Sequence, residues 1–465
     1  MKIRKNSWHL QSGGFLEVLK IALPLILSNS CHAVNMFVDR LMLARHSQEA
    51  VAAAFTGGLT SFTLSCLFVG TVGYTGTFVA QYEGARRRDR IGSAMWQGIW
   101  LALIGGLIFL TGIWWAEPLF NLFGHAPAIA VQETLYFKTL SCGVFVFLLS
   151  VVLPCFWTGR GKTSFVLLVS TFITLCNIPF NYMLIFGCGP IPSLGITGAA
   201  WGTILSELAG LIIYAGFLFA PSSRKHFNTM AFRLDFELLR RMLRYGLPNG
   251  INLALDLVSF NTFSLVLGCY GAGILEATSI TFGINSIAFC PILGISMTAS
   301  ILVGQAIGGE NVPLARKSVK SCLWIVTIYN LLMVLLFTVF QDLVLAPFVR
   351  PGDPAQIEVM RTASVMLLFI AGYLFFDGFN ITLSSALRGA GDTKFAMFVT
   401  SAAGIFLFAL PSVILYRLGF SWWSLWIVLV GYIILLSVIF CLRYMQGKWT
   451  RMRVIEVGAA SDNPA

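Results

Sequence analysis

The two halves of the chain carry the same short motifs in the same order. Three motifs of the first half return in the second: Leu23-Pro24 as Leu247-Pro248, Val79-x-Gln81-x-x-Gly84 as Val303-x-Gln305-x-x-Gly308, and Gly159-x-Gly161-x-Thr163 as Gly389-x-Gly391-x-Thr393. Each copy lies in long apolar segments, so the duplicated unit is expected to be a bundle of membrane helices. Two such bundles that face each other across a central cavity are typical of membrane transporters.

The composition supports a membrane protein. Hydrophobic residues make up 57% of the 465 residues and charged residues only 11%, whereas about 25% is usual for charged residues in soluble domains. Windows of about 20 apolar residues predict twelve spans, six in each half. These spans cover residues 15–38, 58–82, 93–118, 137–157, 163–186, 196–220, 242–268, 278–306, 318–347, 362–386, 394–416 and 421–443.

The predicted fold is therefore all-α and integral to the membrane, with twelve transmembrane helices in two six-helix lobes related by a pseudo-two-fold axis. The expected domains are an N-terminal lobe (1–220), a cytoplasmic inter-lobe linker (221–241), a C-terminal lobe (242–445) and a cytoplasmic tail (446–465). The linker carries Pro221-Ser222-Ser223 before an amphipathic stretch, which is typical of a segment along the membrane surface. No Walker motif occurs, so we expect any pumping to be driven by an ion gradient.

The formal charge of +11 follows from membrane topology. With both termini cytoplasmic, most of the 31 Lys and Arg fall in inside segments, as the positive-inside rule requires. The run Arg86-Arg87-Arg88-x-Arg90 lies between two spans and lacks the interleaved aromatic residues of a nucleic-acid surface. We expect a multi-pass protein of the plasma membrane (a bacterial inner membrane) with the lipid bilayer, and no nucleic acid, as a partner.

Cysteine and histidine patterns give no sign of a metal centre or an enzyme. None of the ten cysteines forms a Cys-x-x-Cys pair, so neither a metal site nor a disulfide framework is indicated. The five histidines are scattered, whereas a membrane enzyme needs a clustered base or nucleophile. We expect no enzymatic activity and no cofactor other than a coupling ion.

Four carboxylates in or next to the expected spans are candidate functional groups. Glu207, Asp256 and Asp377 lie well inside them, and Asp39 lies near the outer end of the first. Ionisable groups in the hydrocarbon region cost several kcal/mol each and usually serve a function. An unpaired carboxylate there either carries a proton or recruits a cation, which is what an ion-coupled carrier requires. The alternative is a protonated carboxyl group that only joins two helices by a hydrogen bond.

Polar neighbours accompany two of these carboxylates. Tyr373 lies one turn before Asp377 and therefore shares its helix face, and Asn380 follows three residues later. Asn252 precedes Asp256 by one turn. Since Asn is costly in lipid, this face is expected to line a polar cavity.

A second polar group is expected in the N-terminal half. Asn177 and Asn181 form an i, i+4 pair on one helix face, and Asp39 could share hydrogen bonds with them if the first and fifth spans are neighbours. A purely structural clasp between helices is the alternative. His32 occupies the position that corresponds to Asp256 in the repeat, and it is either a proton carrier or a hydrogen-bonded cavity residue.

These residues together resemble the multidrug and toxic compound extrusion (MATE) family, over essentially the whole chain to about residue 445. The resemblance rests on the order, spacing and duplication of several motifs: Leu23-Pro24 with Val38-Asp39, Gln81-x-x-Gly84, Gly159-x-Gly161-x-Thr163, Asn177-x-x-x-Asn181, Leu194-Gly195-x-x-Gly198-Ala199-Ala200, Gly246-Leu247-Pro248 and Arg388-Gly389-x-Gly391-Asp392.

The acidic pattern resembles the NorM-like branch of that family. The resemblance implies that Asp377, Tyr373 and Asp256 form a cation site that could take Na⁺, and that Asp39, Asn177 and Asn181 form a polar cluster. Asp256 stands where that branch usually has Glu. Arg40 replaces the small polar residue that commonly follows the first-span aspartate. Both departures leave sodium and proton coupling open.

The resemblance implies an ion-coupled (Na⁺ or H⁺) antiporter that exports cationic, amphipathic drugs or metabolites by alternating access. The alternative is a lipid or lipid-linked sugar flippase of the same wider superfamily, although the spans lack the deep basic residues that would bind a pyrophosphate. A channel is a further possibility, which duplicated lobes with neutralisable carboxylates do not favour. Small organic cations are the expected partners, and one chain already holds both lobes, so a monomer suffices.

Overall fold

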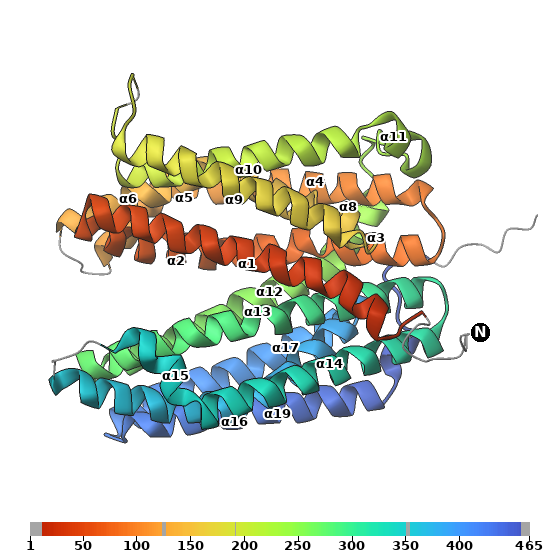
Figure 1. Cartoon of the computed structure of the whole chain (residues 1–465). Coiled ribbons are helices and arrows are strands. Elements are labelled where there is room, and N and C mark those ends of the chain that lie inside the picture. Colours follow the sequence, from red (N-terminus) through yellow and green to blue (C-terminus); the bar gives the residue numbers. More distant parts are fainter. Residues whose placement is uncertain (1–11, 123–126, 191, 350–353, 457–465) are drawn as a thin grey trace, which may run out of the picture.

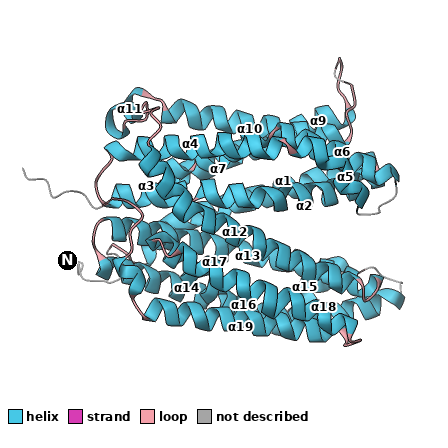
Figure 2. Ribbon diagram, turned by 180° about the vertical axis from the view of Figure 1, so that it is seen from behind, coloured by secondary structure: helices cyan, strands magenta, loops and turns pink. Residues whose placement is uncertain are grey.

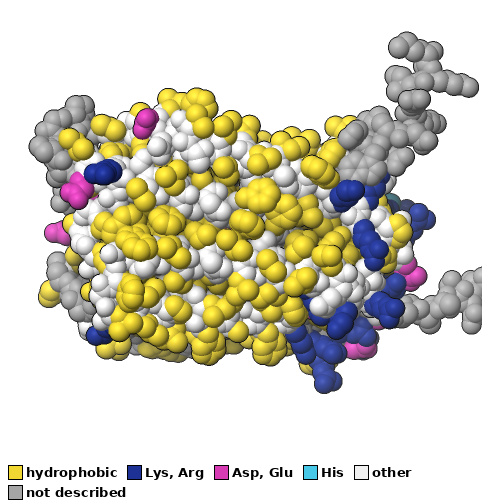
Figure 3. Space-filling model, turned by 90° about the horizontal axis from the view of Figure 1, so that it is seen from below, with side chains coloured by type: hydrophobic (Ala, Val, Ile, Leu, Met, Phe, Trp, Pro, Cys, Tyr) yellow, Lys and Arg dark blue, Asp and Glu magenta, His cyan; other side chains and the backbone are white. Residues whose placement is uncertain are grey.

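The computed structural model describes residues 12–122, 127–190, 192–349 and 354–456. These residues fold into helices without a β-strand, arranged as two bundles (Figures 1 and 2). Eleven helical segments are long and apolar enough to cross a membrane, and a bent pair makes twelve. Apolar side chains cover much of the face seen in Figure 3, where lipid would lie. Strongly exposed apolar residues include Ile212 (64% exposed) and Leu265 (74% exposed).

The first bundle, the N lobe, is built from the helices before residue 220 and is followed by one short helix. Its elements are α1 (Phe15–His46), α2 (Gln48–Gly73), α3 (Thr75–Gly84), α4 (Asp89–Leu110), α5 (Gly112–Leu122), α6 (Pro127–Cys142), α7 (Val144–Val152), α8 (Cys155–Thr158), α9 (Thr163–Phe186) and α10 (Ile196–Leu218), with α11 (Pro221–Phe227) after them.

The second bundle, the C lobe, holds the remaining elements. They are α12 (Phe236–Gly268), α13 (Ala272–Gly308), α14 (Val312–Val339), α15 (Gln341–Leu345), η2 (Ala346–Phe348), α16 (Pro354–Ala390), α17 (Thr393–Ala403), η3 (Gly404–Ala409), α18 (Leu410–Arg417), α19 (Trp422–Met445) and η4 (Lys448–Arg451).

Several span limits differ from those predicted. The second span starts at Gln48 rather than near residue 58, because the side chain of Ser47 accepts a hydrogen bond from the backbone of Ala50 and caps the helix. The fourth span, expected at 137–157, runs from Ile129 to Thr158 and bends by 51° at Gly143. Ile204 packs so closely on Gly143 that a Cβ there would collide with it. The expected linker, 221–241, includes α11 and the first turns of α12.

Helices α1 and α12 each cross from one lobe into the other. The first half of α1 packs into the hydrophobic core of the C lobe through Val18, Ala22 and Leu25. The first half of α12 packs into the core of the N lobe through Leu238 and Met242. The two helices therefore connect the lobes reciprocally, as expected for two copies of one ancestral unit.

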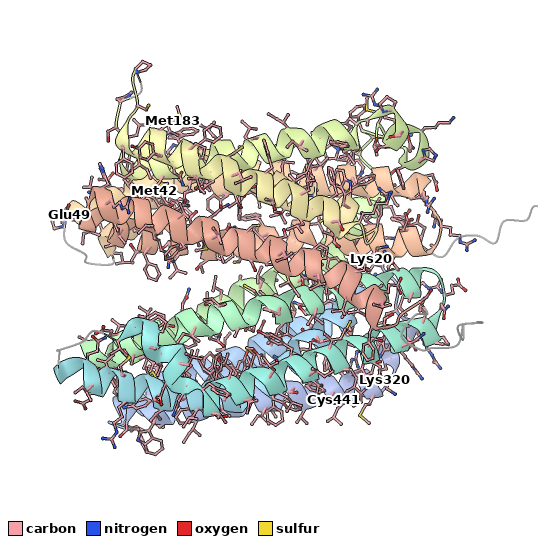
Figure 4. All side chains as sticks on the ribbon, in the orientation of Figure 1. Lys20, Met42, Glu49, Met183, Lys320 and Cys441 are labelled. Carbon is pink, nitrogen blue, oxygen red and sulfur yellow. The ribbon has the colours of Figure 1, made fainter. Side chains whose placement is uncertain are left out.

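Positive charge gathers at one end of the molecule, which we call the basic end. Figure 3 shows Lys and Arg side chains concentrated there on the visible face. Lys20 and Lys320 lie toward this end and Glu49 toward the opposite end (Figure 4). In Figures 1 and 2 the two lobes meet at the basic end and diverge toward the opposite end.

The repeated motifs form the junction between the lobes at the basic end. Gln81 of α3 donates a hydrogen bond to the carbonyl oxygen of Gly389 (3.0 Å). Its counterpart Gln305 of α13 donates to the carbonyl oxygen of Gly159 (2.8 Å). A Cβ on Gly84 would overlap the carbonyl oxygen of Gln305. Glycine is therefore needed where the two backbones approach each other this closely.

A short segment after α19, residues 448–456, ties the C lobe to the N lobe; we call it the strap. Trp449 is buried (1% exposed) and stacks on Tyr444 with ring centroids 5.1 Å apart. The backbone N–H of Val454 donates to Oε1 of Gln81 (2.9 Å), and Val454 lies in the core of the N lobe. The strap is thus an ordered part of the junction. The rest of the predicted tail, 457–465, lies outside the described residues.

The strap ends in a cluster of arginines from the N lobe and α12. The Glu456 carboxylate accepts hydrogen bonds from Arg87 (2.7 Å), Arg90 (3.2 Å), Arg241 (3.3 Å) and the Tyr82 hydroxyl (2.8 Å). Burial by itself would raise the pKa of Glu456, but these hydrogen bonds and the arginine charges outweigh it and hold the pKa below its ordinary value. Arg87 and Arg90, two arginines of the 86–90 run, therefore form ion pairs within the protein.

Candidate ion and substrate sites

The N lobe holds a carboxylate surrounded by neutral hydrogen-bond donors. Asp39 on α1 accepts a hydrogen bond from Nδ2 of Asn181 on α9 and another from the Thr203 hydroxyl on α10 (3.4 Å). Nδ2 of Asn181 also donates to Oδ1 of Asn177 (3.0 Å). The structure therefore brings Asp39, Asn177 and Asn181 together and adds Thr203, which the sequence pattern did not identify. We call these four residues the N-lobe cluster.

Tight helix packing holds this cluster in place. Asn181 is fully buried, and its amide lies against Gly202 so closely that a Cβ there would overlap Oδ1 of Asn181. That Oδ1 atom finds no hydrogen-bond partner among the described residues. An unused buried acceptor beside a carboxylate is a natural ligand for a small cation.

The C lobe holds two carboxylates. Asp377 on α16 is 9% exposed and accepts a hydrogen bond from Asn380 (3.3 Å). Asp256 on α12 accepts one from the Tyr432 hydroxyl of α19 (3.4 Å). The two carboxylates are close enough for their charges to influence each other. Tyr373 is buried (3% exposed) and lies close enough for the charge of Asp377 to act on it. We call Asp256 and Asp377 the C-lobe pair.

A stretch of π-helix positions one partner of the C-lobe pair. Residues Gly404–Ala409 form the π-helix η3 between α17 and α18. Phe408 of η3 stacks on Tyr432 with ring centroids 4.9 Å apart and an interplanar angle of 10°, which orients the Tyr432 hydroxyl toward Asp256. π-Helical turns are often found at functional sites.

Arg388 is a cation of α16 whose charge acts on one member of the C-lobe pair. Helix α16 continues to Ala390, beyond the expected span end at 386, and so includes Arg388. The charge of Arg388 acts on Asp256, while Nη2 of Arg388 donates to the Ser385 hydroxyl (2.9 Å). Arg388 forms no ion pair with Asp256 among the described residues, and its charge acts on Asp256 from a greater distance.

Asn252 and His32, the two remaining predicted site residues, lie apart. Asn252 is buried (6% exposed) one turn before Asp256 on α12. His32 lies on α1 and lines a cavity of about 560 Å³ with Asn29 and Asn35. This cavity lies mainly in the N lobe and is closed on one side by α13 of the C lobe, through residues such as Met297.

The donor sets are suited to a singly charged ion. The described residues contain no group of three or more His, Cys, Asp or Glu side chains that could hold a metal. Each site instead offers one or two carboxylates with hydroxyl and amide oxygens, which are hard ligands. The ion pairs found between described residues lie at the basic end, such as Arg87–Glu456 (2.7 Å) and Arg443–Asp392 (2.7 Å), and none includes the N-lobe cluster or the C-lobe pair.

Twelve apolar spans in two joined lobes, with carboxylates inside both lobes, define an integral membrane transporter rather than an enzyme. The family model MatE matches residues 24–183 and 248–413, which are the two repeats. The chain belongs to the MatE family, and the predicted resemblance is confirmed.

Related sequences and structures agree with this assignment. The chain is 27% identical to a probable multidrug resistance protein NorM of Mesorhizobium japonicum over 95% of both chains. It is 26% identical to the multidrug resistance protein PmpM of Pseudomonas aeruginosa over 83% of this chain and 80% of that protein. A MOP superfamily transporter from Pyrococcus furiosus has the same fold, with a TM-score of 0.84 at 19% identity over 97% of this chain and 100% of that one.

Proposed function

We propose that this protein exports organic cations in exchange for protons or sodium ions, by alternating access of the two lobes. The observation that carries the proposal is a carboxylate site in each lobe that forms no ion pair with described residues and offers oxygen ligands (the N-lobe cluster and the C-lobe pair). The names of the relatives, multidrug resistance proteins, favour drug cations as the substrates.

The distribution of charge suggests the orientation in a bacterial inner membrane. By the positive-inside rule the basic end faces the cytoplasm, which places both termini inside. The glutamine and glycine contacts at this end, Gln81 to Gly389 and Gln305 to Gly159, then close the cytoplasmic side. The described conformation corresponds to a state that opens outward.

In this mechanism the coupling ion acts first on the C-lobe pair. Two carboxylates that influence each other's charge resist being ionised together, so one of them takes up a proton or a cation from outside. Neutralisation weakens the hold on a bound cationic substrate, which leaves outward. Each charge that then moves inward down a potential of about 100 mV supplies about 2.3 kcal/mol, enough for roughly a 50-fold substrate gradient.

The two lobes rock about the crossing helices. Helices α1 and α12 contain Pro24 and Pro248, each near the point where the helix passes from one lobe to the other. Proline removes a backbone hydrogen bond and allows a helix to bend there. The inward-open state requires that the junction at the basic end separate, including the strap.

Ethidium efflux from energy-depleted, efflux-deficient cells tests the proposal, with a sodium gradient imposed first and a proton gradient second. We expect one gradient to drive efflux by the wild type, and Asp377→Asn to abolish that efflux. The variant Glu276→Gln, which changes an exposed carboxylate away from both sites, should export like the wild type.

If neither gradient drives efflux by well-folded wild-type protein, drug export is contradicted. The lipid or lipid-linked sugar flippase then becomes the candidate, and it is assayed with a fluorescent lipid in proteoliposomes.

A further inference from the structure

The cavity of about 560 Å³ contains a carboxylate that belongs to neither ion site. Glu207 on α10 lines this cavity and is partly buried. Glu207 also lines a second, smaller cavity of about 160 Å³ on its other side. Phe62 of α2 and Phe147 of α7 line both cavities as well, so the two spaces adjoin at these three side chains.

The charge of Glu207 is not compensated by a neighbouring cation. The residues that line the larger cavity include no Lys or Arg, and Glu207 is the only Asp or Glu among them. The Ser150 hydroxyl is the hydrogen-bonding side chain that acts on it. The other titratable groups that line the cavity are His32, Tyr214, Cys31 and Cys155. When Glu207 is ionised, the cavity therefore holds one negative charge among mainly neutral walls.

The two cavities differ in polarity. Around the larger one lie the amides of Asn29 and Asn35 and the hydroxyls of Ser28 and Ser170. The smaller one lies among aromatic and aliphatic side chains, with Phe109, Leu140 and Val144 beyond the shared phenylalanines. Ligand sites typically have volumes of about 300–1,000 Å³ and combine apolar walls with a few convergent polar groups. The larger cavity falls in that range.

We propose that Glu207 binds the positive charge of the exported substrate, a monovalent organic cation whose flat apolar part lies against Phe62 and Phe147. A carboxylate in an enclosed site attracts one cation strongly, and aromatic faces add cation–π attraction and stacking. The smaller cavity then takes an apolar substituent. This assignment rests on the proposed export function and adds the place and charge of the substrate.

The position of Glu207 also links the substrate to the coupling ion. Thr203, which donates to Asp39 in the N-lobe cluster, lies one turn before Glu207 on α10. Residues four apart lie on the same helix face, so the substrate charge and an ion at Asp39 would be separated by about one helical turn. Two positive charges at that distance in a poorly screened site repel each other. An ion at Asp39 therefore weakens substrate binding at Glu207.

Binding of ethidium to the purified full-length protein in detergent, measured by fluorescence polarisation, tests this assignment. Glu207→Gln should weaken ethidium binding roughly tenfold or more, because a charge-assisted contact is lost. Glu207→Asp keeps the charge and should weaken it less, and Glu276→Gln should leave it unchanged. Thermal unfolding of each variant checks that the protein is folded. Propidium, a dicationic relative of ethidium, should bind the wild type more weakly than ethidium does.

The possible results separate this assignment from the export function. Wild-type export of ethidium with unchanged binding in folded Glu207→Gln would overturn the assignment and leave the export function intact. Binding that disappears in Asp39→Asn but persists in Glu207→Gln would place the substrate charge on the N-lobe cluster and also overturn it. If the wild type neither binds nor exports ethidium, tetraphenylphosphonium or propidium, the export function itself fails.

Discussion

The carboxylates of the two lobes are held in different ways. In the N lobe, Asp39 receives hydrogen bonds from Asn181 and Thr203, which are neutral donors on two neighbouring helices. In the C lobe, Asp377 and Asp256 influence each other's charge, and each receives one hydrogen bond, of 3.3 and 3.4 Å. Asp39 thus has two neutral donors, whereas Asp256 and Asp377 have one each and act on each other's charge.

This difference suggests a division of labour between the lobes. The charged group that acts on Asp39 is Arg40 rather than a second carboxylate, so ion binding at Asp39 does not depend on the state of another carboxylate. Two carboxylates that repel each other need a proton or a cation to be stable together. We therefore place the obligatory coupling step in the C lobe. An ion in the N lobe has a modulating role, because it weakens substrate binding at Glu207, which lies one turn from Thr203.

The largest expected effect comes from neutralising one carboxylate in each lobe. Asp377→Asn should lower ion-driven ethidium efflux about 100-fold, because the pair can no longer exchange an ion, whereas Asp39→Asn should lower it about tenfold. Initial efflux rates from cells with equal amounts of each variant in the membrane provide the measurement. Equal losses in the two variants would contradict the division of labour.

Removing the amide that donates to a carboxylate should lower the free energy of unfolding more in the N lobe than in the C lobe. Asn181→Ala takes away a donor to Asp39 in a fully buried site and should cost about 1–3 kcal/mol, because a buried carboxylate loses its hydrogen bond. Asn380→Ala removes a bond from an amide that is only partly buried and should cost about 1 kcal/mol or less. Chemical denaturation in detergent compares them. A greater loss of stability in Asn380→Ala than in Asn181→Ala would contradict this expectation.

The paired glutamines allow the same comparison at the junction. Gln81 and Gln305 donate equivalent hydrogen bonds to the opposite lobe, but only Gln81 also accepts one from Val454 of the strap. Gln81→Ala should therefore favour opening of the basic end by about 1 kcal/mol more than Gln305→Ala does. Labelling of a cysteine introduced near this junction, by a membrane-impermeant maleimide, reports the opening. Identical labelling rates would mean that the Val454 contact has no effect.

The smallest effect is expected at the strap, and it depends on pH. The pKa of Glu456 is lowered in the folded protein, so its contacts contribute fully above the ordinary Glu pKa of about 4.3 and are lost only as the pH falls through the lowered value. Glu456→Gln should therefore open the basic end to a small and constant extent between pH 5 and pH 8, by about 1 kcal/mol. The same labelling assay checks this, and an effect that grows across that pH range would contradict it.

The fold could be predicted from the sequence because its signals are repeated and local. The duplicated Leu-Pro, Gln-x-x-Gly and Gly-x-Gly-x-Thr motifs and the apolar windows indicated twelve spans in two lobes. Helix ends were less accurate, since a cap such as Ser47 or a bend such as that at Gly143 depends on a few atoms.

The site was predictable where polar residues lie on one helix face and unpredictable where several helices meet. The Asn177–Asn181 pair and Tyr373 with Asp377 follow from i, i+4 spacing. Thr203 joins Asp39 only through packing of α10 against α1 and α9, and the sequence offers no more than its place one turn from Glu207.

Interactions between residues far apart in the sequence could not be predicted from local spacing. The charge of Arg388 acts on Asp256 because α16 continues beyond its apolar stretch and includes this residue. Glu456 meets the arginines of the N lobe across almost the whole length of the chain, and no local periodicity records such a contact.

Ion release on substrate binding tests the central claim, that the C-lobe pair carries the obligatory coupling ion, most directly. Tetraphenylphosphonium is added to purified protein in weakly buffered detergent solution, and released protons or sodium ions are followed with a pH indicator or a sodium electrode. We predict full release by the wild type, slightly less by Asp39→Asn, and by Asp377→Asn no more than the small release that comes from Asp39. Undiminished release by folded Asp377→Asn, with loss in Asp39→Asn, would move the coupling ion to the N lobe and contradict the account.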